Sequence, residues 1–182
     1  MGVTAFGDVV LEEVLKGVLE DMEATIIEKQ AHIQLEDLPT IKGDHRPLHQ
    51  LFQNLVSNAL KYQKKEVPPS LHITCKVVTG EESGADVPHD RSKEQFYQVE
   101  IKDNGIGFDP ADAGRIFRLF QRLHIKSEYE GTGVGLAIVQ RVVENHRGFI
   151  TVESQPQEGA KFKVLLPTYD VNKELVAEGL AG

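Results

Sequence analysis

The chain has 182 residues, a hydrophobic content of 40% and a net charge of −8, which together indicate one globular domain with a sizeable core. The negative charge, without a basic stripe carrying interleaved aromatic residues, excludes nucleic acid as an expected partner. The single cysteine, Cys75, excludes a disulfide framework and a cysteine metal cluster, and it indicates a reducing compartment.

The first third of the chain predicts two helices and a short strand. Apolar residues recur at helical spacing from position 8 to about 30, and Asp8 is a candidate N-cap. Alternation over residues 32–36 predicts a strand. A second helix is expected to begin near Pro47, which suits a first helical turn, and to end before Pro68. Its buried side is expected to comprise Leu48, Leu51, Phe52, Leu55, Val56, Ala59 and Leu60.

The rest of the chain alternates strands with helices. Residues 70–78 and 95–101 are rich in β-branched and aromatic residues and predict an antiparallel pair, joined by a polar loop over 79–94. The elements expected after it are a short helix over 111–120, a helix over 134–145 and a hairpin formed by 149–153 and 161–166. The order predicts an α/β (α+β) two-layer sandwich, in which helices cover one face of a mixed, largely antiparallel sheet. We expect the domain to cover residues 9–167, between starting residues 1–8 and a tail over 168–182.

Two asparagines on the second predicted helix are the first candidate site. Asn54 and Asn58 are four positions apart and therefore project from one face, which Lys61 and Tyr62 continue. Amide oxygens can bind Mg²⁺ together with substrate phosphates, and Lys61 could offset phosphate charge. A solvated polar stripe opposite the apolar side is the simpler explanation of the pair taken alone.

The second candidate site is Asp103-Asn104-Gly105-Ile106-Gly107, which follows a strand predicted to be buried. A carboxylate at Asp103 can accept a hydrogen bond from the exocyclic amine of adenine. Gly105 and Gly107 allow the backbone to turn sharply and to approach a ligand closely. Asp-Asn-Gly is also a common turn signal, so an ordinary turn remains an alternative.

The third candidate site is Gly131-Thr132-Gly133-Val134-Gly135-Leu136, just before a predicted apolar helix. Amides at the N-terminus of that helix could face phosphate oxygens. A flexible linker and a dinucleotide-binding fingerprint are the alternatives. The fingerprint requires a strand immediately before it, whereas residues 121–130 are polar.

The segment between the two glycine clusters, residues 108–130, combines apolar anchors such as Phe120 with several cations. This composition predicts a lid that closes over nucleotide phosphates, with Arg122 as the best candidate for a phosphate contact. A surface helix with apolar anchors and solvated charges is the alternative.

Taken in this order, the segments resemble the ATP-binding catalytic domain of sensor histidine kinases, within the superfamily shared with gyrase, Hsp90 and MutL. Residues 51–62 resemble the asparagine box of that family, 103–107 the first glycine box, 116–124 the phenylalanine box and 131–136 the second glycine box. The sequence Glu130-Gly131-Thr132-Gly133 is similar to that of the phytochrome-like branch of the family. The resemblance runs from about Val9 to Pro167.

The resemblance implies Mg·ATP as the ligand. Asn58 would bind Mg²⁺, Asn54 would lie near the phosphates, and Asp103 would recognise adenine. Lys61 and Arg122 would contact phosphates, and with Asn54 they are the residues expected to act in catalysis. The other nucleotide-binding residues that it implies are Tyr62, Gly105, Ile106, Gly107, Phe120, Gly131, Thr132, Gly133, Val134, Gly135 and Leu136.

The resemblance also implies partners outside the chain. Histidine kinases accept phosphate on a histidine of a separate helical hairpin, within His-Asp/Glu-x-Arg/Lys-x-Pro, and none of the seven histidines here lies in that pattern. His89-Asp90-Arg91-Ser92 begins like it but lacks the proline. We therefore expect a monomeric catalytic fragment whose partners are its own dimerisation and phosphoacceptor domain and a response regulator receiver domain. With no signal peptide and no apolar run of about 20 residues, the fragment is expected to be cytoplasmic without membrane contact.

Three other functions remain as alternatives. The ATPases of the superfamily carry a glutamate that activates water, and Asn54 occupies that position here, which disfavours hydrolysis because an amide is not a general base. A serine kinase of the anti-sigma type is disfavoured by the long lid. A nucleotide-binding module without catalysis is disfavoured because all four boxes are present.

Overall fold

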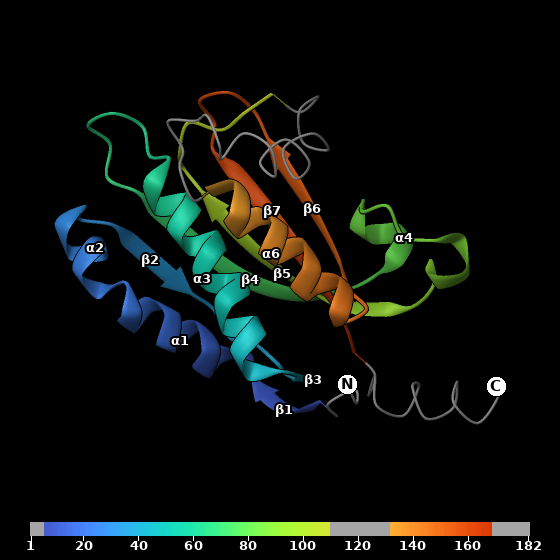
Figure 1. Cartoon of the computed structure of the whole chain (residues 1–182). Coiled ribbons are helices and arrows are strands. Elements are labelled where there is room, and N and C mark those ends of the chain that lie inside the picture. The colour runs from blue at the N-terminus through green and yellow to red at the C-terminus, as the bar shows by residue number, and fades with distance from the viewer. Residues whose placement is uncertain (1–5, 110–131, 169–182) are drawn as a thin grey trace.

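The computed structural model describes residues 6–109 and 132–168, with the backbone alone for residues 132–136. One layer of helices lies over one face of a twisted sheet (Figure 1). In chain order the elements are β1 (Gly7–Val10), α1 (Leu11–Asp21), α2 (Glu23–Glu28), β2 (His32–Leu35), β3 (Thr40–Gly43), α3 (His45–Lys61), β4 (Ser70–Thr79), α4 (Gly80–Ser83), the 3-10 helix η1 (His89–Arg91), β5 (Gln95–Asp103), α6 (Thr132–Asn145), β6 (Phe149–Ser154) and β7 (Ala160–Pro167).

The main sheet has five strands in the order β2-β4-β5-β7-β6. β2 and β4 are parallel, whereas the other neighbours are antiparallel. β5 is central and pairs with β4 from Gln95 to Asp103, so the strand is held along its whole length. The architecture confirms the predicted two-layer sandwich with a mixed, largely antiparallel sheet.

The core lies between α3 and the inner face of the sheet. All seven residues predicted for the buried side of α3 are at most 6% exposed. They pack in one cluster with Ile73, Val99, Ile101 and Val164 of the sheet and with Val139 of α6. Burial of such apolar side chains is the main favourable contribution to folding. α3 thus packs against both the sheet and α6, and its polar flank lies outside this core.

The prediction of one helix from Asp8 to about residue 30 is wrong at its start. Residues 7–10 form β1, which pairs with β3, and Asp8 lies opposite Lys42 with an ion pair of 2.7 Å. The helix begins at Leu11 with Val10 as its N-cap residue and no side-chain cap bond. It is interrupted at Met22, so that α2 is separate. Four-residue strands whose partner is distant leave little local signal, and tertiary pairing overrides helical propensity.

The connection over residues 79–94 is more ordered than the predicted loop. It contains α4 and η1, and Arg91 anchors it to the sheet. The Arg91 guanidinium lies 5.4 Å and 5.0 Å from the ring centroids of Phe96 and Phe149. It also donates hydrogen bonds to Glu94 Oε2 and to the Arg147 carbonyl oxygen. The short helix predicted over residues 111–120 lies outside the described residues.

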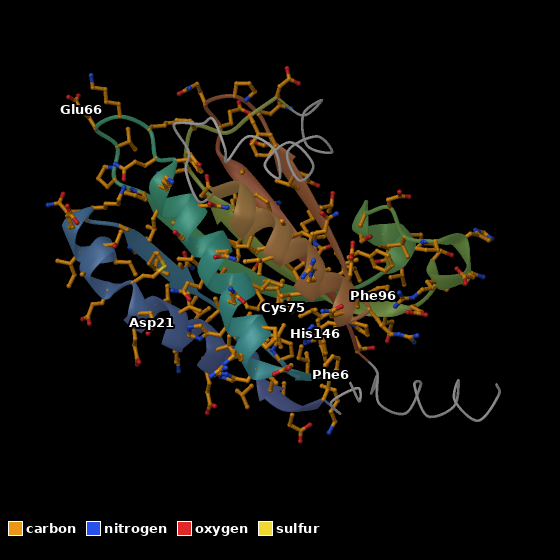
Figure 2. The ribbon with its side chains drawn as sticks, viewed as in Figure 1. Phe6, Asp21, Glu66, Cys75, Phe96 and His146 are labelled. Carbon is orange, nitrogen blue, oxygen red and sulfur yellow. The ribbon has the colours of Figure 1, made fainter. Side chains whose placement is uncertain are left out.

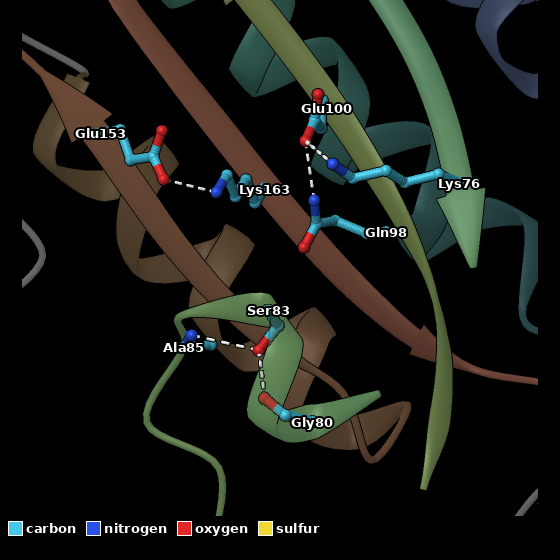
Figure 3. A network of polar contacts seen from close by, with 8 residues as sticks. All are labelled: Lys76, Gly80, Ser83, Ala85, Gln98, Glu100, Glu153 and Lys163. Atoms are coloured by element: carbon cyan, nitrogen blue, oxygen red, sulfur yellow. Dashed lines mark hydrogen bonds and ion pairs between the residues drawn. The ribbon is translucent and has the colours of Figure 1, made fainter. Parts of the chain in front are cut away.

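Polar side chains line the sheet next to this connection (Figure 3). Gln98 Nε2 donates to Glu100 Oε1 at 2.7 Å, and Lys76 pairs with the same carboxylate at 3.7 Å. A second ion pair joins Lys163 to Glu153 across β7 and β6. These pairs lie on the face away from the helices, so they leave the helix-covered face apolar.

One buried histidine joins the β1–β3 ribbon to α6. Phe6, which directly precedes β1, stacks on His146 just after the end of α6 (Figure 2), with ring centroids 4.6 Å apart. His146 Nδ1 bonds the Val142 carbonyl oxygen at 2.8 Å, and Nε2 accepts the Asp44 N–H at 3.0 Å. Both ring nitrogens are therefore used, and the ring is neutral. Burial lowers the pKa of His146, partly opposed by its hydrogen bond to Val142 and by the Asp44 charge.

Among the described residues, no helix combines the length and the apolar character needed to cross a membrane.

Candidate functional site

The C-terminal half of α3 carries the two predicted asparagines. Leu51 and Leu55 of the same turns are buried, whereas Asn54 and Asn58 are half-buried at the edge of the helix layer. The structure thus places the pair on one flank of a continuous helix, as their spacing predicts, and neither side chain is fully solvated. Lys61 is exposed, with its Nζ atom 5.9 Å from the centre of the Tyr62 ring.

Asp103 is the last residue of β5 and is only 9% exposed. Its Oδ1 accepts hydrogen bonds from the Gly105 N–H at 2.8 Å and from the Ala160 N–H at 3.2 Å. Burial raises the pKa of this carboxyl, and the two backbone hydrogen bonds oppose the shift without cancelling it. Both hydrogen bonds that the described residues make with the carboxylate end on Oδ1, so Oδ2 retains acceptor capacity.

The turn after β5 is packed directly against the end of α3. A Cβ atom on Gly105 would lie 2.4 Å from the Tyr62 carbonyl oxygen, so only glycine allows this approach. The same oxygen accepts the Ile106 N–H at 3.0 Å. Two motifs that are far apart in sequence therefore meet, and the structure brings the asparagine-bearing helix and the Asp103 turn together.

Asn104 strengthens this junction from the other side. Its Oδ1 accepts the Ser70 N–H at 2.8 Å, and its Nδ2 donates to the Pro68 carbonyl oxygen at 3.2 Å. The side chain therefore ties the segment that leaves α3 to the end of β5. In the sequence, Asn104 is only part of a glycine cluster, and the pattern predicts no role for its side chain.

The turn between β6 and β7 forms the opposite wall of the junction. Gly107 has φ +63°, and a Cβ atom there would lie 2.1 Å from the Gln155 carbonyl oxygen. Gly159 has φ +83°, and its Cβ would lie 2.0 Å from the Asp103 carbonyl oxygen. The Gln157 N–H bonds the Ile106 carbonyl oxygen at 2.6 Å. Asp103 also adjoins a hollow of about 490 Å³ where β5, β6 and β7 meet this turn.

The sequence does not predict that the turn between β6 and β7 lies beside Asp103. The sequence predicts residues 155–159 only as the loop of a hairpin, and a hairpin loop carries no local signal for what lies beside it. Only the pairing of β5 with β7 brings the turn to Asp103.

The second glycine cluster opens α6. The helix begins at Thr132, two residues before the predicted start, so Thr132, Gly133, Val134, Gly135 and Leu136 form its first turns. Farther along, Val139, Val142 and Val143 are buried. The predicted site residues Phe120, Arg122 and Gly131 lie outside the described residues.

The sequence matches a known family over most of its length. A sequence profile described as histidine kinase-, DNA gyrase B- and HSP90-like ATPase matches residues 43–170. Cyanobacterial phytochrome A of Nostoc sp. is 41% identical over 157 residues, which are 86% of this chain and 18% of that protein. The adaptive-response sensory kinase SasA of Synechococcus elongatus is 34% identical over 165 residues, 89% of this chain and 38% of that protein. The chain thus spans well under half of the length of either relative.

Solved structures share the fold. The mycobacterial sensor histidine kinase MprB superposes with a TM-score of 0.67 at 22% identity, covering 91% of this chain and 99% of that one. Full-length ShkA in complex with AMPPNP gives a TM-score of 0.68 at 24% identity, covering 93% of this chain and 33% of that one.

Proposed function

Because this chain belongs to the family of histidine kinase-, DNA gyrase B- and HSP90-like ATPases, we propose that it binds Mg·ATP and transfers the γ-phosphoryl group to a histidine of a separate domain. The observation that carries the proposal is the junction between α3 and the turn after β5, which sets an amide-bearing helix beside a buried carboxylate. The AMPPNP in the ShkA complex and the sensory-kinase name of SasA support it.

Asp103 is proposed to recognise the adenine base. Two backbone N–H groups hold Oδ1, and Oδ2 is then the acceptor for the exocyclic amine of adenine. Guanine presents a carbonyl oxygen at that position, and two acceptors facing each other repel. Ile106 and the glycine backbone at 105 and 107 would form the edge of the base pocket.

α3 is proposed to serve the phosphate end of the nucleotide. The half-buried amide of Asn58 has the oxygen donor that Mg²⁺ prefers, and Asn54 lies one turn away on the same flank. Mg²⁺, when bound, would neutralise phosphate charge during transfer. Lys61 and Tyr62 extend this flank. The amides that open α6 at residues 132–136 suit phosphate oxygens, and the roles of Phe120, Arg122 and Gly131 rest on sequence alone.

Transfer is favoured over hydrolysis because Asn54 cannot act as a general base. Phosphoryl transfer depends on positioning and charge neutralisation, which these groups could supply. The sequence His89-Asp90-Arg91-Ser92 is not proposed as an acceptor, because it lacks the proline of the acceptor pattern and forms a short 3-10 helix instead of part of a helical hairpin. The acceptor is therefore proposed to lie on a dimerisation domain, with a receiver domain as the next partner.

The test is phosphorylation of the whole protein, or of this chain mixed with its acceptor domain, by γ-labelled ATP and Mg²⁺. We expect a label that is lost in acid and stable in base, as for phosphohistidine. Asn58→Ala should abolish labelling, whereas Asn145→Ala, an exposed asparagine at the end of α6, should leave it unchanged. An acid-stable label, or efficient release of inorganic phosphate without any label, would refute the proposal.

A further inference from the structure

We propose that Ser154 is a positioning residue for adenine recognition, which fixes the Asp103 carboxylate without contacting the nucleotide. Ser154 is the last residue of β6 and is 8% exposed. This inference rests on the proposed role of Asp103.

The Ser154 hydroxyl joins the two segments that hold Asp103. Its Oγ donates to the Gly159 carbonyl oxygen at 2.6 Å and accepts the Phe108 N–H at 2.9 Å. Gly159 immediately precedes Ala160, whose N–H bonds Asp103 Oδ1. Phe108 ends the turn whose Gly105 N–H bonds the same oxygen.

These bonds form a closed circuit around the carboxylate. One path runs from Asp103 through the Gly105 turn to Phe108, and the other runs through Ala160 to Gly159. Ser154 connects the far ends of both paths. Among the described residues, the two N–H groups that bond Asp103 Oδ1 therefore belong to two segments, and Ser154 joins these segments to each other.

Removing the hydroxyl should loosen both paths. Two backbone groups beside the turn would lose a buried partner, and both segments could relax away from each other. The backbone contacts at Gly107 and Gly159 would remain, because they depend on glycine and not on Ser154. The expected result is a folded protein whose Asp103 carboxylate is less well oriented.

The chain contains a matched control in Ser83. Its Oγ donates to the Gly80 carbonyl oxygen at 2.6 Å and accepts the Ala85 N–H at 3.1 Å (Figure 3). The residue is 2% exposed. The two serines thus share chemistry and burial. Ser83 belongs to the connection between β4 and β5, and no hydrogen bond found for it reaches the Asp103 turn.

The experiment compares the wild-type chain with Ser154→Ala, Ser154→Thr and Ser83→Ala. Thermal unfolding reports stability, and calorimetric titrations with Mg·ADP and Mg·GDP report affinity and base preference. We expect Ser154→Ala to raise the Kd for Mg·ADP by roughly fivefold to tenfold and to reduce the preference for ADP over GDP. Ser83→Ala should lower Tm comparably without changing Kd, and Ser154→Thr, which keeps the hydroxyl, should restore most of the preference.

A readout without nucleotide separates this inference from the proposed function. The pKa of Asp103, measured by carboxyl-carbon NMR, should rise in Ser154→Ala and stay unchanged in Ser83→Ala, because only the former loosens the donors to Oδ1. If Ser154→Ala does not fold, Ser154→Cys, with a weaker donor, replaces it under the same expectation. An Asp103 pKa and a base preference that are both unaffected, with lowered Tm alone, would overturn the inference. Failure of the wild-type chain to bind ADP would instead refute nucleotide binding, whatever the NMR result.

Discussion

Two buried titratable groups lie in different parts of this molecule, and their surroundings differ in a way that bears on function. His146 uses both ring nitrogens within the protein, one with Val142 and one with Asp44. Asp103 uses one oxygen with two backbone donors and adjoins a hollow. Burial disfavours the charged form in both, lowering one pKa and raising the other. Burial and a perturbed pKa are therefore common to both groups, and the difference lies in hydrogen-bonding capacity, which is used up at both nitrogens of His146 and retained at Oδ2 of Asp103.

The largest expected effect concerns His146, whose two ring nitrogens are both bonded within the protein. His146→Ala removes the stacked partner of Phe6 and leaves the Asp44 N–H without its acceptor. Together the cavity and the lost hydrogen bond should lower the free energy of unfolding by about 3 kcal/mol. Denaturant titration measures this, with His89→Ala, an exposed histidine, as a control within about 0.5 kcal/mol of wild type. An equal loss of stability in both variants would show that the buried contacts of His146 stabilise the fold no more than an exposed histidine does.

The next effect concerns Asp103, whose Oδ2 retains acceptor capacity. Asp103→Asn can keep an oxygen for the Gly105 and Ala160 N–H groups, and it then faces the adenine amine with a second donor. We expect the Kd for Mg·ADP to rise roughly 100-fold with a small change in Tm. Glu153→Gln, an exposed carboxylate beside the same hollow, should leave the Kd unchanged. Wild-type affinity in Asp103→Asn would remove adenine recognition from this residue.

The smallest effects concern pH, and the two groups should act with opposite sign on stability. In the folded protein the pKa of His146 is below its ordinary value of 6.5. The stability that the neutral, buried ring contributes is therefore complete above about pH 6.5. It is lost as pH falls from there, because the unfolded chain takes up the proton first. Asp103 has a folded pKa above 3.8. Its charged form disfavours folding, and this penalty is relieved as pH falls through the raised value.

Unfolding measured as a function of pH separates the two contributions. His146→Phe should remove the loss of stability just below pH 6.5, and Asp103→Asn should leave that loss in place. Binding of Mg·ADP should weaken as the Asp103 carboxyl becomes protonated, at a higher pH than for an ordinary aspartate. Affinity that stays constant through the protonation of Asp103 would contradict this.

Local patterns predicted the parts of the molecule that local physics determines. The apolar side of α3 was predicted in full, because one helix face must meet the core at a period of 3.6 residues. Asp103 was predicted at a strand end from the glycine turn that follows it. The β1–β3 ribbon, the Asn104 side-chain bonds and the position of Ser154 were not predicted. Each depends on segments that meet only in the folded chain, so no window of sequence contains the cause.

The central position of β5 makes the end of this strand, and the Asp103 carboxylate on it, rigid before any ligand binds. Opening the end of that strand would break ladders on both sides, with β4 and β7, so its amides should be among the slowest to exchange with solvent. A carboxylate anchored there is already preorganised before any nucleotide arrives. The proposed adenine site should then bind its ligand with little loss of conformational entropy, and affinity gained in this way needs no additional contact.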